Sequence, residues 1–176
     1  MKTILVAVDG SDHSNRAIQL ASDIASKYDA KLLLLHVVDA HPLTEEERRL
    51  ATTEFSELLG RHASDSDVEE IRTIGAEGAQ PFFFHHAKTG MIIHTALGEG
   101  FLETANREAK AFGAENVETI LENGDPAKTI LDVANKHHAN LIVIGSRGQS
   151  DVKALFMGSV SHKVSNLSDI NVITVK

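Results

Sequence analysis

Short apolar runs that alternate with helical patterns constrain the fold of this chain more than any other feature. Residues 3–9, TILVAVD, form a β-branched and nearly continuous apolar run, which predicts a strand buried on both faces of a sheet. A helical pattern occupies residues 11–30, and the strand signature returns in KLLLLHVVDA at 31–40. These segments predict a βαβ unit, whose crossover is right-handed in nearly all proteins.

The two clearest helical patterns have recognisable caps. The first helix has Ser11 or Ser14 available as its N-cap, and another at 124–140 has Asp125 as cap followed by Pro126 at its first position. The spacing predicts one apolar stripe on each helix, made of Ala17, Ala21, Ile24 and Tyr28 on the first and of Ile130, Val133, Ala134 and His137 on the second.

The second half of the chain repeats the alternation. The segment 101–114 predicts a helix that ends at Gly113, and the segment 158–168 predicts another that opens at Gly158 or Ser159. Strands are expected at 116–122, 141–145 and 170–176. Five buried strands alternating with helices predict a three-layer α/β/α fold with a parallel sheet. We interpret residues 1–176 as a single domain.

Residues 41–97 interrupt the alternation and are interpreted as a partly helical insert. Thr44 and Glu47 form a capping-box pattern, which predicts one helix continuing through Leu50, Phe55 and Leu58. From residue 60 to residue 100 the signals conflict, and the segment is either an appended subdomain or a lid. Its apolar stretches, PFFFHH at 81–86 and MIIHTAL at 91–97, predict packing near a dimer surface or over a ligand crevice.

Glycine-rich turns follow two of the predicted strands. DGS at 9–11 and GSRG at 145–148 come where strands end, and Gly158–Ser159 opens a helix. Parallel α/β sheets bind ligands beyond the carboxyl ends of their strands. Glycine lets the backbone approach a ligand, and helix N-termini favour phosphate. Glycines after strands are also ordinary turn residues. Neither a P-loop, G-x-x-x-x-G-K-[ST], nor G-x-G-x-x-G after the first strand is present.

Several of these segments together resemble the universal stress protein family. They are ILVAVDGSDHS, LLLLHVV and GDPAKTILDVANKHHANLIVIGSRG, followed nine residues later by GS. The spaced positions Gly145, Gly148, Gly158 and Ser159 fit G-x₂-G-x₉-G-[ST], the signature of the family's ATP-binding branch. The resemblance covers residues 2–40 and 98–176. It implies the adenine nucleotide alpha hydrolase-like, Rossmann-like sheet with strand order 3-2-1-4-5.

The resemblance also implies an adenine-nucleotide site that binds ATP, or AMP or ADP, with Mg²⁺ or Mn²⁺. Asp9 would lie near the ribose hydroxyls or a phosphate-bound metal ion, and Val37 would offer backbone contacts to adenine. A guanidinium at Arg147 could pair with a phosphate. The residues that this resemblance assigns to nucleotide binding are Ala7, Val8, Asp9, Val37, Gly145, Arg147, Gly148, Gly158, Ser159, Val160 and Ser161.

By the same resemblance, we expect a regulatory protein of the stress response that acts as a homodimer through residues 171–175. A nucleotide-independent partner-binding module and a slow ATPase are the alternatives. No residue is assigned a catalytic role. The net charge of −8 disfavours nucleic acid as a partner. The absence of cysteine fits a reducing compartment. Apolar runs far shorter than ~20 residues predict no membrane insertion, so a cytoplasmic location is expected.

Histidines raise the question of a metal site in the insert. His41, His62, His85, His86 and His94 lie in or beside it, and imidazole binds transition metals readily. The H-E-x-x-H spacing is absent from the sequence, and adjacent histidines on a strand point to opposite faces. We therefore assign no metal ligand, and a metal-dependent site in the insert stays a minor alternative.

Overall fold

The computed structural model describes residues 2–39, 41–73, 86–148 and 157–176. Residues Met1–Val37 and Phe101–Lys176 form one compact unit, here the sheet unit, and Val38–Gly100 form a second, here the insert unit. The interpretation of the chain as one domain with an insert at 41–97 stays a prediction.

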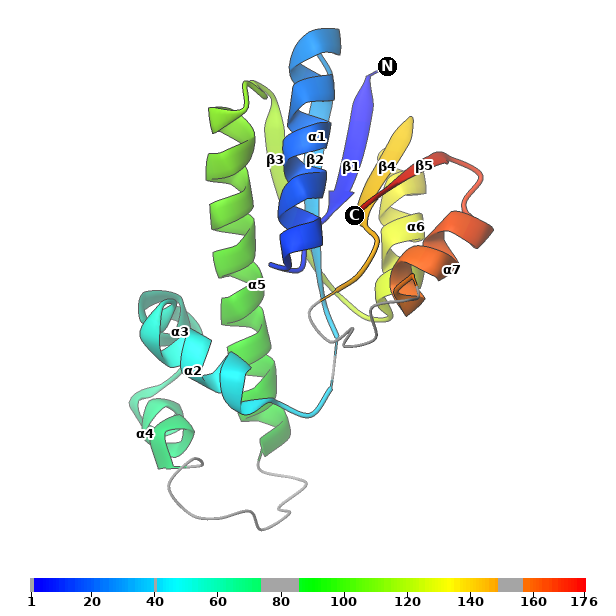
Figure 1. Cartoon of the computed structure of the whole chain (residues 1–176). Coiled ribbons are helices and arrows are strands. Elements are labelled where there is room, and N and C mark those ends of the chain that lie inside the picture. The colour runs from blue at the N-terminus through cyan, green and yellow to red at the C-terminus, as the bar shows by residue number, and fades with distance from the viewer. Residues whose placement is uncertain (1, 40, 74–85, 149–156) are drawn as a thin grey trace. The chain divides into compact units, whose positions relative to one another are not determined.

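Five parallel strands form the sheet, as expected from the sequence (Figure 1). Their order is β3-β2-β1-β4-β5. In the centre, Val6 of β1 is in register with Leu34 of β2 and with Val143 of β4. Ile4, Leu5 and Val6 of β1 are fully buried although successive side chains point to opposite faces of the sheet, which confirms the prediction for TILVAVD. The strands are β1 (Thr3–Ala7), β2 (Lys31–Val38), β3 (Val117–Asn123), β4 (Leu141–Gly145) and β5 (Asn171–Val175).

Helices cover both faces of the sheet and give three layers (Figure 1). Ile4 and Val6 of β1 pack with α1 and the second half of α5, whereas Leu5 between them packs with α6 and α7. This follows from the alternation of side chains along a strand. The helices of these layers are α1 (Asp12–Tyr28), α5 (His86–Ala111), α6 (Pro126–Lys136) and α7 (Ser159–Leu167).

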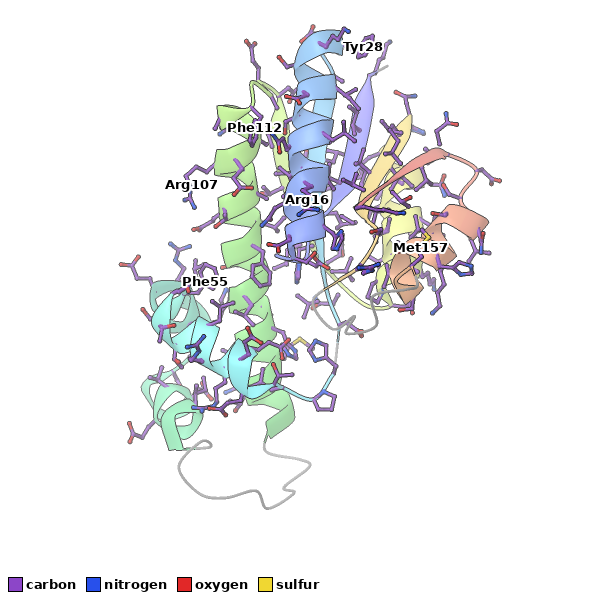
Figure 2. All side chains as sticks on the ribbon, in the orientation of Figure 1. Arg16, Tyr28, Phe55, Arg107, Phe112 and Met157 are labelled. Carbon is purple, nitrogen blue, oxygen red and sulfur yellow. The ribbon has the colours of Figure 1, made fainter. Side chains whose placement is uncertain are left out.

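The predicted caps of α1 and α6 are largely confirmed. Ser11 caps α1 by accepting from the Ser14 amide, and Asp125 caps α6 by accepting from the Lys128 amide. Tyr28 does not continue the buried stripe of α1, because it is 57% exposed at the last turn of the helix (Figure 2). The other predicted stripe residues are buried in both helices, apart from the half-buried Ile24 and from His137, which is the C-cap of α6.

The insert unit contains α2 (Glu45–Thr53), α3 (Ser56–His62), α4 (Asp65–Thr73) and the start of α5. The capping box of Thr44 and Glu47 is present at the start of α2. The prediction of one helix through Leu58 is wrong, because the chain leaves helical geometry at Phe55, with φ −115° and ψ 28°. The hydroxyls of Thr52 and Thr53 donate to carbonyls of the preceding turn, a pairing that bends helices.

Helix α5 begins fifteen residues before the expected start at residue 101, which makes the prediction for this boundary wrong. Several glycines lie within it and weaken the helical signal. One has a packing reason, since a Cβ on Gly100 would clash with the ring of Phe55, a side chain that Figure 2 labels. The segment MIIHTAL is helical, whereas Pro81–His85 lie outside the described residues. Within the described ranges, no helix is long and apolar enough to span a membrane.

Candidate functional site

The carboxyl ends of β1 and β4 lie next to each other in the middle of the sheet. From β1 the sheet continues through β2 to β3 on one side and through β4 to β5 on the other. The strand order therefore reverses between β1 and β4, the position where open α/β sheets bind ligands. The loop after β1 contains Asp9, and the loop after β4 contains Gly148. Both loops are among the glycine-containing turns that the sequence indicates as candidates for ligand binding.

The loop after β1 is a tight turn held by its own side chains. The amide of Ser11 donates to Asp9 Oδ1 at 2.9 Å, and the Asp9 amide donates to Ser14 Oγ at 3.2 Å. Gly10 between them has φ 77°, a conformation that glycine adopts at little cost. These contacts fix the Asp9 carboxylate at the start of α1, beyond the end of β1.

Gly145 ends β4 where the backbone of α1 approaches closely. A Cβ at this position would lie 2.9 Å from His13 C and 3.0 Å from Ser14 N. Both atoms belong to the first turn of α1, so they cannot move without moving the helix. Gly145 therefore has a packing reason to be glycine, independent of the ligand contact that the family resemblance assigns to it.

The two loops meet above the strand ends. Asp9 Oδ2 lies 2.9 Å from the position that a Cβ on Gly148 would take. Ser11 Oγ donates to the Arg147 carbonyl at 3.4 Å. Asp9 is thus a neighbour of Arg147 and Gly148, although about 140 residues separate it from them in sequence. All three residues are half-buried. Any group bound over Gly148 would lie beside the Asp9 carboxylate.

The first turn of α7 adds main-chain donors to the same region. Its N-cap, Gly158, is tied to the loop after β4 by its amide, which donates to the Ser146 carbonyl at 2.7 Å. In this described part of the chain, no side chain caps the helix. The first amides of a helix have no partner within it, and the helix dipole is positive there. The amides of Ser159, Val160 and Ser161 therefore suit an anion.

The hydroxyl of Ser161 is not available to a phosphate, because it is buried and bonded within the protein. Its side chain is 3% exposed, and its Oγ lies 3.0 Å from the carbonyls of both Ser146 and Gly158. The hydroxyl donates to these carbonyls and holds the start of α7 against the end of β4. Ser159, in contrast, is exposed, so both its hydroxyl and its amide remain candidates for phosphate contact.

The apolar members of the predicted set lie beneath these loops. The side chains of Ala7, Val37 and Val160 pack against the core on the α6 and α7 face of the sheet. Val8 is buried on the other face, and its amide donates to the Leu35 carbonyl at 2.8 Å. Their side chains are therefore engaged in the core, and their main-chain atoms are what they can offer to a ligand.

His36 belongs to the same region and was missed by the sequence reasoning. Its Nδ1 donates to the Val8 carbonyl at 2.7 Å, and its ring lies edge-on to Phe101 with centroids 5.7 Å apart. Burial lowers the pKa of His36 below its usual 6.5, against the opposing effects of the Val8 hydrogen bond and the Asp9 charge. His36 is therefore neutral near pH 7. The signal available in the sequence was its position near the carboxyl end of a predicted strand, next to Val37.

The fold and its loops define a class of proteins with a parallel α/β sheet and a candidate anion site at the switch between β1 and β4. The model of the universal stress protein family matches residues 1–176. Universal stress protein YxiE of Bacillus subtilis is 36% identical over 174 residues, covering 98% of this chain and 97% of that protein. The chain belongs to the universal stress protein family.

Solved structures have the same fold. Universal stress protein UspA from Lactobacillus plantarum superposes with a TM-score of 0.67 at 22% identity, covering 99% of this chain and 97% of its own. An Arabidopsis thaliana universal stress protein with AMP bound has a TM-score of 0.60 at 21% identity and covers 100% and 92%. Another, in complex with cAMP, has a TM-score of 0.58 at 23% identity and covers 99% and 95%.

Proposed function

We propose that this protein binds ATP, as a Mg²⁺ or Mn²⁺ complex, at the carboxyl ends of β1 and β4. The observation on which the proposal depends is the meeting of three features there: the Asp9 carboxylate, the close approach at Gly148 and the first turn of α7, which no side chain of the described residues caps. Phosphate oxygens need donors, and successive backbone amides supply them without the cost of ordering long side chains.

Each part of the nucleotide then has a place. The phosphates lie on the amides of Ser159, Val160 and Ser161, and the ribose and first phosphate lie over Gly148 beside Arg147. The Asp9 carboxylate faces the ribose hydroxyls or the metal ion. Main-chain atoms near Val8 and Val37 meet the adenine edge. Support comes from the sequence signature and from family members whose structures contain AMP or cAMP.

Binding, rather than turnover, is the proposed activity. Phosphoryl transfer needs a positioned base and groups that stabilise the charge of the transferring phosphoryl. Asp9 is the carboxylate beside Gly148, and its Oδ1 accepts the Ser11 amide, which gives it a structural role in the loop after β1. The bound nucleotide would instead set the state of a homodimer in the cytoplasm, formed through β5, which is an edge strand of the sheet. Edge strands are commonly paired or covered.

Calorimetric titration with ATP, ADP and AMP, with and without Mg²⁺, tests the proposal. The wild type is expected to bind ATP, and Gly148→Val is expected to lose binding, because its side chain occupies the space of the phosphate and meets Asp9 Oδ2. Gly60→Ala is the matched control, since among the described residues no atom lies within 4 Å of a Cβ there. A wild type that ignores all three nucleotides at millimolar concentration would leave a nucleotide-independent partner-binding module as the better account.

A further inference from the structure

Three side chains with metal-binding atoms meet within the insert unit. They are His41 before α2, Glu47 in the first turn of α2 and His94 in α5, and one ligand atom from each lies within 4.8 Å of the other two. We propose that these residues form a binding site for a divalent transition-metal ion, Zn²⁺ in the first place. None of these three residues belongs to the proposed nucleotide site.

The distances suit a small ion. Glu47 Oε1 lies 3.5 Å from His41 Nε2 and 4.0 Å from His94 Nε2. Zinc bonds of about 2.0–2.2 Å in tetrahedral geometry place ligand atoms ~3.4 Å apart. The imidazole of His41 already meets this spacing from the carboxylate, and the His94 imidazole needs a shift of roughly half an ångström. The ligand atoms of the two imidazoles lie within 4.8 Å of each other, so these side chains must approach each other by up to ~1.4 Å to share one ion.

Hydrogen bonds outside the cluster orient two of the ligands. Glu47 Oε2 accepts from the Thr44 amide at 2.8 Å and from Thr44 Oγ1 at 2.7 Å, which leaves Oε1 facing the imidazoles. His41 Nδ1 lies 3.2 Å from the Pro42 carbonyl. Because a carbonyl only accepts, Nδ1 has the proton and Nε2 has the free lone pair. Outer hydrogen bonds of this kind are typical of metal ligands.

Burial also favours a site over a chance contact. The His94 side chain is 7% exposed and that of Glu47 is 17% exposed, whereas His41 is 43% exposed. The two inner ligands are held by α2 and α5, and the outer one lets an ion enter from solvent and leaves a coordination position for water. Two histidines and a glutamate with one water is an established zinc ligand set. Mg²⁺ and Ca²⁺ prefer oxygen ligands throughout.

Local spacing could not reveal this cluster. His41 and Glu47 are six residues apart, and His94 follows 47 residues later, across a predicted insert of unknown fold. The helical reading of MIIHTAL places His94 on a buried face of α5. The capping box then fixes Glu47 opposite it. No metal ligand was predicted from the sequence because only short local spacings such as H-E-x-x-H were considered there.

Metal titration of the full chain, without a polyhistidine tag, without nucleotide and after chelator treatment, tests the proposal. Co²⁺ is expected to bind with a stoichiometry of one, to give the intense visible absorption of a four-coordinate site, and to be displaced by Zn²⁺. His94→Gln and Glu47→Gln are expected to weaken Zn²⁺ binding at least tenfold, since even outer-shell partners are worth about 10–100-fold. Gln at position 47 keeps the capping box, so Glu47→Gln should fold.

His62→Ala is the matched control. His62 forms a similar pair with Glu99, at 3.0 Å between Nε2 and Oε2, but in the described residues this pair has no second imidazole within ligand distance. Zinc affinity should be unchanged in this variant. In wild-type imidazole NMR spectra, the resonances of His41 and His94 should shift with Zn²⁺ while those of His62 stay. Equal zinc affinity in Glu47→Gln and wild type, or zinc shifts at His62 instead, would overturn the proposal.

Discussion

Gly145→Ala should destabilise the sheet unit even without any ligand. The new methyl group would lie 2.9 Å from His13 C and Cβ and 3.0 Å from Ser14 N. Non-bonded carbon atoms are comfortable at about 3.5–4.0 Å, so the first turn of α1 must retreat by ~0.5 Å or more. Ser14 resists this movement, because it is 1% exposed and its Oγ accepts the Asp9 amide.

The expected cost is that of overpacking a closely packed position, about 1–3 kcal/mol of unfolding free energy. For a chain of this length each kcal/mol corresponds to roughly 2–4 °C in Tm, which gives a decrease of about 2–12 °C. Urea unfolding followed by circular dichroism and by fluorescence of Tyr28, the sole tyrosine, measures it. Tyr28 ends α1 and reports on the sheet unit.

Gly60→Ala provides the comparison for this change. In α3, among the described residues, no atom lies within 4 Å of a Cβ at position 60. Alanine in a helix is more favourable than glycine by about 0.5–1 kcal/mol, so this variant should be as stable as wild type or slightly more so. A Gly145→Ala protein that unfolds at the wild-type urea concentration would refute the packing explanation of Gly145.

Three further changes test other contacts. Gly100→Ala should lower Tm by several degrees, because its Cβ would clash with the Phe55 ring. The pKa of His36 is lowered in the folded protein, so the free energy of unfolding should decrease as pH falls below 6.5. Urea unfolding of His36→Asn across this range should show a weaker pH dependence. Lys88 and Ser64 lower the pKa of Asp67, whose contribution is present above its usual 3.8 and lost in acid; Lys88→Met should shift the Asp67 NMR titration upward.

The fold of the sheet unit could be predicted because its signals are local. Each strand is a short apolar run, and helices such as α6 have a cap and a buried stripe that are adjacent in sequence. The predictions from local sequence failed at positions whose environment is set by residues distant in sequence. Helix α5 contains Gly100 because the Phe55 ring needs the space, and Tyr28 falls on the expected stripe but lies at an exposed helix end.

The sequence indicated which loops lie next to each other, but it did not indicate the structural role of each residue in them. The glycine spacing selected the loops that meet at Asp9 and Gly148, because parallel strands end at one edge of a sheet. The glycine spacing could not show that the two glycines differ in role. Gly145 leaves room for the backbone of α1, whereas Gly148 lies beside the Asp9 carboxylate. The spacing also could not reveal that the Ser161 hydroxyl is directed to carbonyls of the protein, since both roles suit a serine near a helix start.

Amide NMR of the labelled protein tests the central claim most directly. Addition of ATP with Mg²⁺ should shift the backbone amide resonances of Gly148, Ser159 and Val160, and AMP should shift a subset of them. Adenosine, which has no phosphate, should leave the two α7 amides where they are. Equal shifts at Ser159 and Val160 with adenosine and ATP, or no shift with either, would contradict phosphate binding at the first turn of α7.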